Sequence, residues 1–421
     1  IQRLDYTLWS SPVTGQGLYA FSPTTLPNRF YVYNPNTNQY SNAVGFDLVN
    51  LQYPTPLVAP NGINGTDNNN VEFAQATGYL IRTPYNHALT PTTFAGTFAG
   101  VANNGDITVS GLTNGLYYAV GNPYPSTIDA DQFILDNSIG DNPLTLGDGL
   151  YFWRKTNNAS QATNPTASYA TYTTAGGVKS GGDTLDIVPS GVIQVGEGFI
   201  VKTTATSLVF NNNQRIANND DQFLKTSSVE RHRIWLNLAS ATSIVNQMMV
   251  SYMTGATQGI DAAIDGRFFN DSPTALNSLV NNEEFSIQGR SLPFESTDVV
   301  ALVFKTAIAG TYSIAIDQVD GIFSNANQNI FLKDNLLNVE HNLRNAPYSF
   351  ATEAGSFTNR FEIVYQSTLS VSNPTFENGV VVYSKNKVIE INTGLEAMAT
   401  VRVLDVRGSV IAESKAVHAT T

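Results

Sequence analysis

The sequence predicts an all-β protein: two consecutive antiparallel β-sandwiches of the jelly-roll or immunoglobulin-like kind, followed by a small β-sandwich. Three observations favour this class. Only 13% of the 421 residues are charged and 42% are hydrophobic, the chain holds 19 Tyr and 22 Phe, and short apolar runs alternate with loops rich in Asn, Thr, Ser and Gly. Because this length exceeds the usual size of one hydrophobic core, we expect domains at residues 1–225, 226–366 and 367–421.

Apolar runs that begin on a glycine mark the predicted strands of the first domain. The runs are "GLYAF" at Gly17, "GYLIR" at Gly78, "GLYYAV" at Gly115, "GLYFW" at Gly149 and "GFIVK" at Gly198. Glycine suits the turn before each strand, and aromatic and β-branched residues suit a half-buried pleated surface. Because the runs are unevenly spaced, they indicate a sandwich or barrel rather than a solenoid.

One stretch of the first domain, "VGNPYPSTIDADQFILDN", predicts a short helix. Two prolines end the preceding strand, and Ser126 is the predicted N-cap. We expect Ile128, Phe133 and either Ile134 or Leu135 to face the core.

The second and third domains are predicted to consist of strands as well. After the polar linker "NNDDQFLKTSSVERH", apolar runs continue from "HRIWLNLAS" to "NRFEIVYQ", and Tyr312, Ile314 and Ile316 alternate with small or polar residues. This pattern predicts a second antiparallel sandwich. A linker-like stretch then precedes "VVVYSKNKVIEINTG" and "TVRVLDVRGSVIAESKAV", which predict a β-meander of four or five strands, too small to bury much surface by itself.

Charge and cysteine content exclude several classes of partner and site. With 34 Asp and Glu against 22 Lys and Arg, the formal charge is −12, so the mean field repels nucleic acid and anionic membrane surfaces. The absence of cysteine excludes disulfides and thiolate metal sites. The start "IQRLDYTLWSSPV" has neither the basic nor the apolar region of a signal peptide, so we expect the chain to be a piece of a longer protein.

Motifs of catalysis are not found in the sequence, and no catalytic residue is predicted. The four histidines, His87, His232, His341 and His418, lie far apart without metal-ligand spacing. The run "GQGLYA" matches the GxGxxA form of a dinucleotide fingerprint, but the prolines of "FSPTTLPN" follow it where a helix is required. We therefore predict a turn there and a protein that is not an enzyme.

Two candidate binding sites remain open. Asp129 and Asp131 in "TIDADQF" supply the oxygen ligands that calcium prefers, although helix capping and turns are the more frequent role of such residues. No other cofactor is predicted. Tyr31 and Tyr33 share one face of a predicted strand and are candidate glycan contacts, although aromatic residues in strands more often belong to the core.

The order of several motifs resembles a known family. "YYAVGNPYPSTIDADQFI", "GEGFIVK", "HRIWLNL" and the tail "VVVYSKNKVIEI…VRVLDVRGSVI" are similar to the C-terminal region of large surface proteins exported by the type IX secretion system of gliding bacteria. The resemblance covers nearly the whole chain. The tail resembles the C-terminal sorting domain of that family, in the variant called the type C signal.

The resemblance implies where a sorting signal lies. In that family the tail folds as a small β-sandwich that the outer-membrane translocon and its shuttle barrel recognise. Carried onto this sequence, the signal includes two residues at its start, Asn373 and Pro374, and five residues of the final hairpin: Val401, Leu404, Asp405, Gly408 and Val410. A residue that accepts positive φ suits the turn at Gly408. Because family tails continue for another strand after "AVHATT", we expect the sorting domain to be incomplete.

Three functions follow from these observations as hypotheses. The first is a secreted, adhesin-like protein of the cell surface that crosses the outer membrane by way of its C-terminal domain. The second is a carbohydrate-binding region of an exported polysaccharide-degrading enzyme, which contacts surface glycans. The third is a glycosidase within the first domain, because two catalytic carboxylates are usually distant in sequence.

Overall fold

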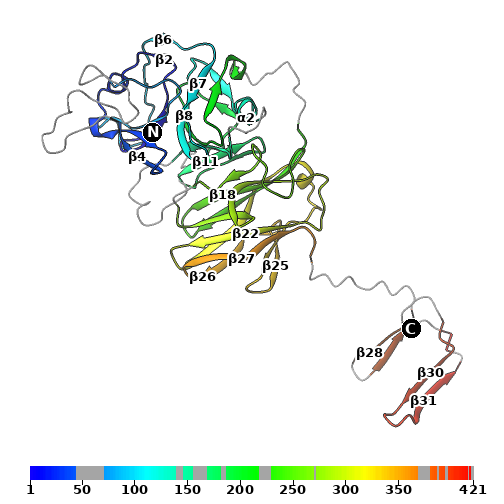
Figure 1. Ribbon diagram of the computed structural model, residues 1–421. Helices are drawn as coiled ribbons and strands as arrows, with labels where there is room; N and C mark the ends of the chain where they lie inside the picture. Colours follow the sequence, from blue (N-terminus) through cyan, green and yellow to red (C-terminus); the bar gives the residue numbers. More distant parts are fainter. Residues whose placement is uncertain are drawn as a thin grey trace. The chain divides into compact units, whose positions relative to one another are not determined.

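Strands form most of the structure, and the protein is all-β, as the sequence predicts. The computed structural model describes residues 1–43, 71–138, 146–154, 168–181, 186–217, 229–269, 272–367, 380–385, 388–393, 397–415 and 417–418. The chain divides into two units, Ile1–Gln366 (unit 1) and Ser367–Thr421 (unit 2), and the ribbon can be followed in Figure 1. This division falls at the predicted boundary between residues 366 and 367. Within the described ranges, no helix is long and apolar enough to cross a membrane.

The first part of unit 1, residues 1–217, consists of small sheets. One sheet has the order β1 (Tyr6–Trp9), β5 (Tyr79–Arg82), β3 (Phe30–Asn34) and β4 (Gln39–Asn42). A second has the order β12 (Gly176–Val178), β11 (Tyr169–Thr173), β10 (Leu150–Trp153), β14 (Gly198–Lys202) and β8 (Tyr117–Gly121). The smaller sheets are β13 (Val192–Ile193) with β9 (Thr127–Asp129) and β16 (Arg215–Ile216), β15 (Ser207–Phe210) with β7 (Ile107–Ser110), and β2 (Val13–Thr14) with β6 (Val101–Ala102). Short 3-10 turns lie at η1 (Pro27–Arg29) and η3 (Asn212–Gln214) in this part, and at η4 (Gly321–Ser324) in the second part of unit 1.

Four of the five glycine-led runs are strands, β5, β8, β10 and β14, but the run at Gly17 is not. There, the helical turn α1 (Leu18–Phe21) forms, with the Phe21 N–H donating to the Gly17 carbonyl at 3.0 Å. Leu18 and Phe21 are both buried in one apolar cluster. Because residues three apart share a face in a helix and oppose each other in a strand, only the helical turn buries both side chains. The strand prediction for this run is therefore wrong.

The predicted helix forms as α2 (Ala130–Ser138), but its cap differs from the prediction. Asp129 is the N-cap, since its Oδ1 accepts from the N–H groups of Asp131 at 2.8 Å and Gln132 at 3.2 Å. Ser126 lies before β9, and its hydroxyl accepts from Arg215 Nε at 2.8 Å instead. The short strand β9 pairs with β13 and β16. Because of this pairing, the N-cap lies three residues later in the chain than predicted. Within α2, Phe133 and Ile134 are buried, as expected.

The second part of unit 1, residues 229–366, is one large sheet of eleven described strands. Its order is β25 (Val339–Asn342), β24 (Phe331–Asp334), β27 (Gly355–Val364), β22 (Val299–Thr306), β20 (Ala275–Val280), β21 (Glu283–Arg290), β18 (Ile244–Met253), β17 (Arg231–Ser240), β23 (Gly310–Val319) and β26 (Tyr348–Thr352), with β19 (Gly266–Arg267) beside β21. The pairing of β18 with β21 is parallel, and the other pairings in this sheet are antiparallel.

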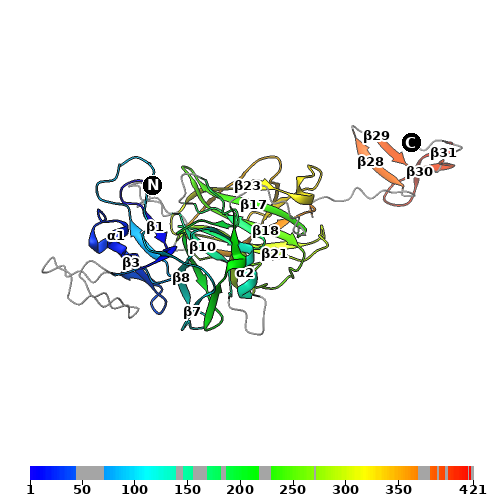
Figure 2. The ribbon, with the colours of Figure 1, turned by 90° about the horizontal axis from the view of Figure 1, so that it is seen from above.

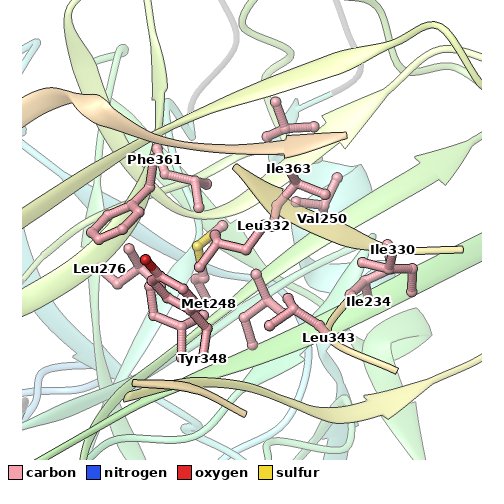
Figure 3. Packing of buried hydrophobic residues seen from close by; sticks show 14 of the residues in the cluster. Ile234, Met248, Val250, Leu276, Ile330, Leu332, Leu343, Tyr348, Phe361 and Ile363 are labelled. Carbon is pink, nitrogen blue, oxygen red and sulfur yellow. The ribbon is translucent and has the colours of Figure 1, made fainter. Parts of the chain in front are cut away.

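This large sheet folds over so that its two ends pack face to face. Phe350 of β26, at one end of the order, lies with its ring centroid 5.1 Å from that of Phe304 in β22 and 4.8 Å from that of Phe361 in β27. Figure 3 shows the buried side chains that fill the space between the facing strands, with Tyr348 and Phe361 among them. The alternation predicted from Tyr312, Ile314 and Ile316 is confirmed, since Tyr312 and Ile314 are buried in this core and Ile316 is partly buried against it.

The two parts of unit 1 share an apolar cluster. Figures 1 and 2 show the five-stranded sheet beside the eleven-stranded sheet, near β11 and β18 and near β10 and β17. Trp235 of β17 packs in a cluster with Val178 of β12, and its indole N–H donates to the Gly177 carbonyl at 2.8 Å. Arg233 reaches the Ala175 carbonyl at 3.1 Å while its Nε donates to Asp320 at 2.8 Å. The predicted domain boundary between residues 225 and 226 falls outside the described residues, and it stays a prediction.

Candidate functional site

Unit 2 consists of two β-hairpins in its described part. β28 (Val381–Lys385) pairs with β29 (Val388–Asn392), and β30 (Thr400–Leu404) pairs with β31 (Val410–Lys415), both antiparallel. Each sheet has two strands. An isolated two-stranded sheet in water is at best marginally stable, so such hairpins gain stability when a further strand or surface covers them.

The turn of the second hairpin is shaped by two residues of the predicted signal. Asp405 Oδ1 accepts from the N–H groups of Arg407 at 2.8 Å and Ser409 at 2.9 Å. Gly408 has φ of 82°, the left-handed conformation that the sequence predicts there, and its N–H donates to the Asp405 carbonyl at 3.0 Å. The spacing of Asp405 and Gly408 thus has a local cause. The carboxylate of Asp405 accepts hydrogen bonds from N–H groups of the turn, and Gly408 adopts the positive φ of the turn without steric strain.

Replacing Gly408 by Ala is expected to destabilise the β30–β31 hairpin by about 1–2 kcal/mol, because a Cβ disfavours the left-handed conformation by that amount. Amide hydrogen exchange of β30 and β31 in the full chain measures this as faster exchange. Arg407→Ala is the matched control, since Arg407 lies in the same turn with an exposed side chain. Equal exchange in the two variants would contradict a role for positive φ.

Unit 2 exposes an unusual number of large apolar side chains. Leu404 and Val410 of the predicted signal are each 53% exposed, and Val401 is half-buried. Further exposed apolar residues of unit 2, which the sequence reasoning did not single out, are Val380, Val382, Tyr383, Val388, Ile389, Val406 and Ile411. The apolar runs at the two ends of "VVVYSKNKVIEI" were the available signal for several of them. Asn373 and Pro374 lie outside the described residues.

Both faces of the first hairpin carry apolar residues: Val382, Ile389 and Ile391 lie on one face, and Tyr383 and Val388 lie on the other. Val382 pairs with Ile391 and Ser384 pairs with Ile389 across the hairpin, and directly opposed residues of an antiparallel pair share a face. Val382 and Ile389 are more than half exposed. An exposed apolar face of this kind, on a two-stranded sheet with outer edges, suits strand addition or apolar docking to a partner protein.

The two predicted calcium ligands have other partners. Asp129 caps α2, as described above, and Asp131 accepts from the Tyr172 hydroxyl at 3.0 Å and lies 3.7 Å from an Arg231 guanidinium nitrogen. Burial raises the pKa of Asp131, against the lowering effects of Tyr172 and Arg231. Among the residues that the structure describes, no three His, Cys, Asp or Glu side chains gather as a metal site. In this arrangement both aspartates have structural roles, one as a helix cap and the other as a partner of Tyr172 and Arg231.

The two predicted glycan contacts lie together in an aromatic cluster of unit 1. Tyr33 is buried and Tyr31 half-buried. The ring centroids of Tyr31 and Tyr6 are 5.9 Å apart, and those of Tyr33 and Tyr40 are 5.2 Å apart, both in edge-to-face geometry. The Tyr33 hydroxyl donates to Asn38, and burial raises the pKa of Tyr33. This packing is typical of core aromatics, because each ring satisfies its faces and edges with other rings.

The fold defines a class of protein: an all-β chain with a large unit of packed sheets and a separate C-terminal unit of hairpins. Residues 1–365 match the family model described as domain of unknown function DUF8693, and the chain belongs to that family. Residues 369–421 match a second model, described as domain of unknown function DUF8694. No curated protein and no solved structure matches the chain. The two family matches follow the division into unit 1 and unit 2.

Proposed function

We propose that this is an adhesin-like, non-enzymatic protein of the cell surface that the type IX secretion system exports, with unit 2 as its sorting signal. The outer-membrane translocon and its shuttle barrel are the proposed partners of unit 2. The single observation that carries the proposal is a separate small unit that exposes large apolar side chains on hairpins. In a unit that served only its own stability, these side chains would be covered.

Two further observations support the proposal. The tail motif resembles the sorting domains of type IX cargo proteins, and the residues of that motif build the turn at Asp405 and Gly408. Unit 2 also has a family model of its own, which fits a module that accompanies a passenger and does not share its core.

Deletion of residues 368–421 is expected to abolish export, because the proposed recognition surface is removed while unit 1 keeps its core. The full chain and the deleted chain are each fused to the same signal peptide for passage across the inner membrane and are produced in a bacterium with an active type IX system. Immunoblots then compare the periplasm, the cell surface and the medium. The deleted chain should accumulate in the periplasm. Export of the deleted chain at the level of the full chain would refute the proposal.

A pair of single substitutions separates the signal from a general effect of charge. Ile411 in unit 2 is 68% exposed, and Leu336 in unit 1 is 66% exposed. Ile411→Lys should lower export because it places a charge on the proposed docking surface, whereas Leu336→Lys should leave export unchanged. Equal export of both variants would show that the apolar residues of the second hairpin are not recognised.

A further inference from the structure

A pocket of about 250 Å³ opens in the first part of unit 1, with lining residues from β11 and the start of α2. Both elements are labelled in Figure 1. The pocket lies where the five-stranded sheet meets the segment that leads into β13. Phe152 and Arg154 from the end of β10, Tyr172 from β11, and Glu197 from the turn before β14 line it. Its volume is slightly below the range of about 300–1,000 Å³ that is usual for drug-sized ligands, so it suits a ligand of one ring.

Hydrogen bonds to the surrounding backbone and side chains hold the pocket walls in place. The Tyr172 hydroxyl donates to Asp131 at 3.0 Å, and the Gln194 N–H donates to Glu197 Oε2 at 2.8 Å. The Ala130 N–H donates to the Gly191 carbonyl at 2.8 Å, which ties the loop that forms one wall to the start of α2. A pocket that is fixed in this way loses little conformational freedom when a ligand binds.

The chemistry of the lining combines aromatic surface with two planar charged groups of opposite sign. Phe152 and Tyr172 are largely buried, so they form walls rather than a rim. Burial raises the pKa of Glu197, while the Gln194 N–H and the positive charge of Arg154 lower it. Because the charges of Arg154 and Glu197 compensate each other, the pocket offers several hydrogen-bonding groups with little net charge.

We propose that this pocket binds one uncharged sugar residue of a glycan, with aromatic contact from Phe152 and Tyr172 and hydrogen bonds from Arg154 and Glu197. An aromatic wall fits the apolar C–H face of a sugar ring, and planar carboxylate and guanidinium groups fit neighbouring hydroxyls. This inference goes beyond the proposed export role and does not depend on it. It places carbohydrate binding away from Tyr31 and Tyr33.

The test uses the purified full chain and a panel of methyl glycosides of neutral hexoses and N-acetylhexosamines. Saturation-transfer NMR identifies the glycosides that bind, and calorimetry measures their dissociation constants. At least one glycoside should bind saturably. Glu197→Gln and Arg154→Met should each weaken that binding by roughly tenfold to a hundredfold, the usual effect of losing a hydrogen bond to a charged group.

Two further variants keep the test decisive. Ser190 is exposed at the rim of the pocket, so Ser190→Trp should block binding without removing a buried group, even if a pocket variant fails to fold. Tyr33→Phe removes the hydroxyl that bonds Asn38 and should bind as the native chain does. The proposal is overturned if no glycoside binds, or if zwitterionic amino acids bind in preference to the glycosides. It is also overturned if the pocket variants and Ser190→Trp bind normally, or if only Tyr33→Phe loses binding.

Discussion

Replacing Arg360 by Met is expected to lower the free energy of unfolding of unit 1 by about 3–5 kcal/mol, the usual result of leaving one member of a buried ion pair without its partner. Arg360 is 5% exposed and Asp334 is fully buried. The Arg360 Nε lies 3.2 Å from Asp334 Oδ2, and a terminal nitrogen of the same guanidinium lies 3.0 Å from it. The aromatic rings of Phe350, Phe357 and Phe361 surround the guanidinium, with the first and the last at 4.7 and 4.8 Å.

The carboxylate of Asp334 makes this loss large because it organises the hairpin between β24 and β25. It accepts from the Tyr348 hydroxyl at 3.0 Å and from the N–H groups of Leu336 at 3.0 Å and Leu337 at 3.3 Å. Without the guanidinium, the negative charge of Asp334 would remain in the apolar core. Asp334 would then have to become protonated or be hydrated by water that enters the core, and either change lowers the free energy of unfolding.

Urea denaturation of the full chain, followed by tryptophan fluorescence, measures the effect. Lys333→Met is the matched control, because Lys333 precedes Asp334 in β24 and pairs with Glu362 of β27 at 3.1 Å, but in a partly exposed position. The control should lose no more than about 1 kcal/mol, as surface pairs usually do. Similar losses of stability in the two variants would mean that burial does not determine how much the Arg360–Asp334 pair contributes to the free energy of unfolding.

Replacing Gly181 by Ala is expected to cost at least about 3 kcal/mol, at the upper end of what an overpacked site costs. A Cβ at Gly181 would fall on the backbone carbonyl of Val245 in β18, where no flexible side chain can give way. The neighbouring Lys179 is anchored on the same surface, since its N–H donates to the Gln247 side chain at 3.1 Å and its ammonium lies 3.3 Å from Asp317. The substitution therefore pushes this segment of the first part of unit 1 away from the large sheet.

The same denaturation experiment tests this prediction, with Gly310→Ala as the control. Gly310 begins β23, and a Cβ there would meet no atom within 4 Å. Gly310→Ala should change stability by less than about 0.5 kcal/mol, as ordinary surface substitutions do. If Gly181→Ala unfolds at the same urea concentration as the native chain, then the two parts of unit 1 do not depend on this contact.

The strands were predictable from the sequence where a local pattern decides the structure. Aromatic and β-branched runs bounded by turn residues became β5, β8, β10 and β14, and the runs of residues 229–366 became strands of the large sheet. The prediction failed at Leu18–Phe21, where burial of two residues three apart produced a helical turn. It also misplaced the cap of α2, because pairing of β9 with two distant strands is invisible in a local window.

The candidate sites were predictable to different degrees for the same reason. The turn formed by Asp405 and Gly408 lies within a few residues, so the sequence predicts its positive φ. The pocket draws Phe152, Tyr172 and Glu197 from three separate segments, and no spacing in the sequence relates them. Sequence reasoning missed all of its lining residues.

The sequence by itself determined that the protein is all-β, that its strands begin and end near glycine and polar turns, and that residues 367–421 stand apart, because backbone preference and the alternation of apolar residues act locally. Only the tertiary structure decided how the large sheet folds over, how Arg360 meets Asp334, and how the two parts of unit 1 meet at Gly181 and Trp235. Those features depend on close packing between residues far apart in the chain, and packing of that kind is settled by shape in three dimensions rather than by neighbours in sequence.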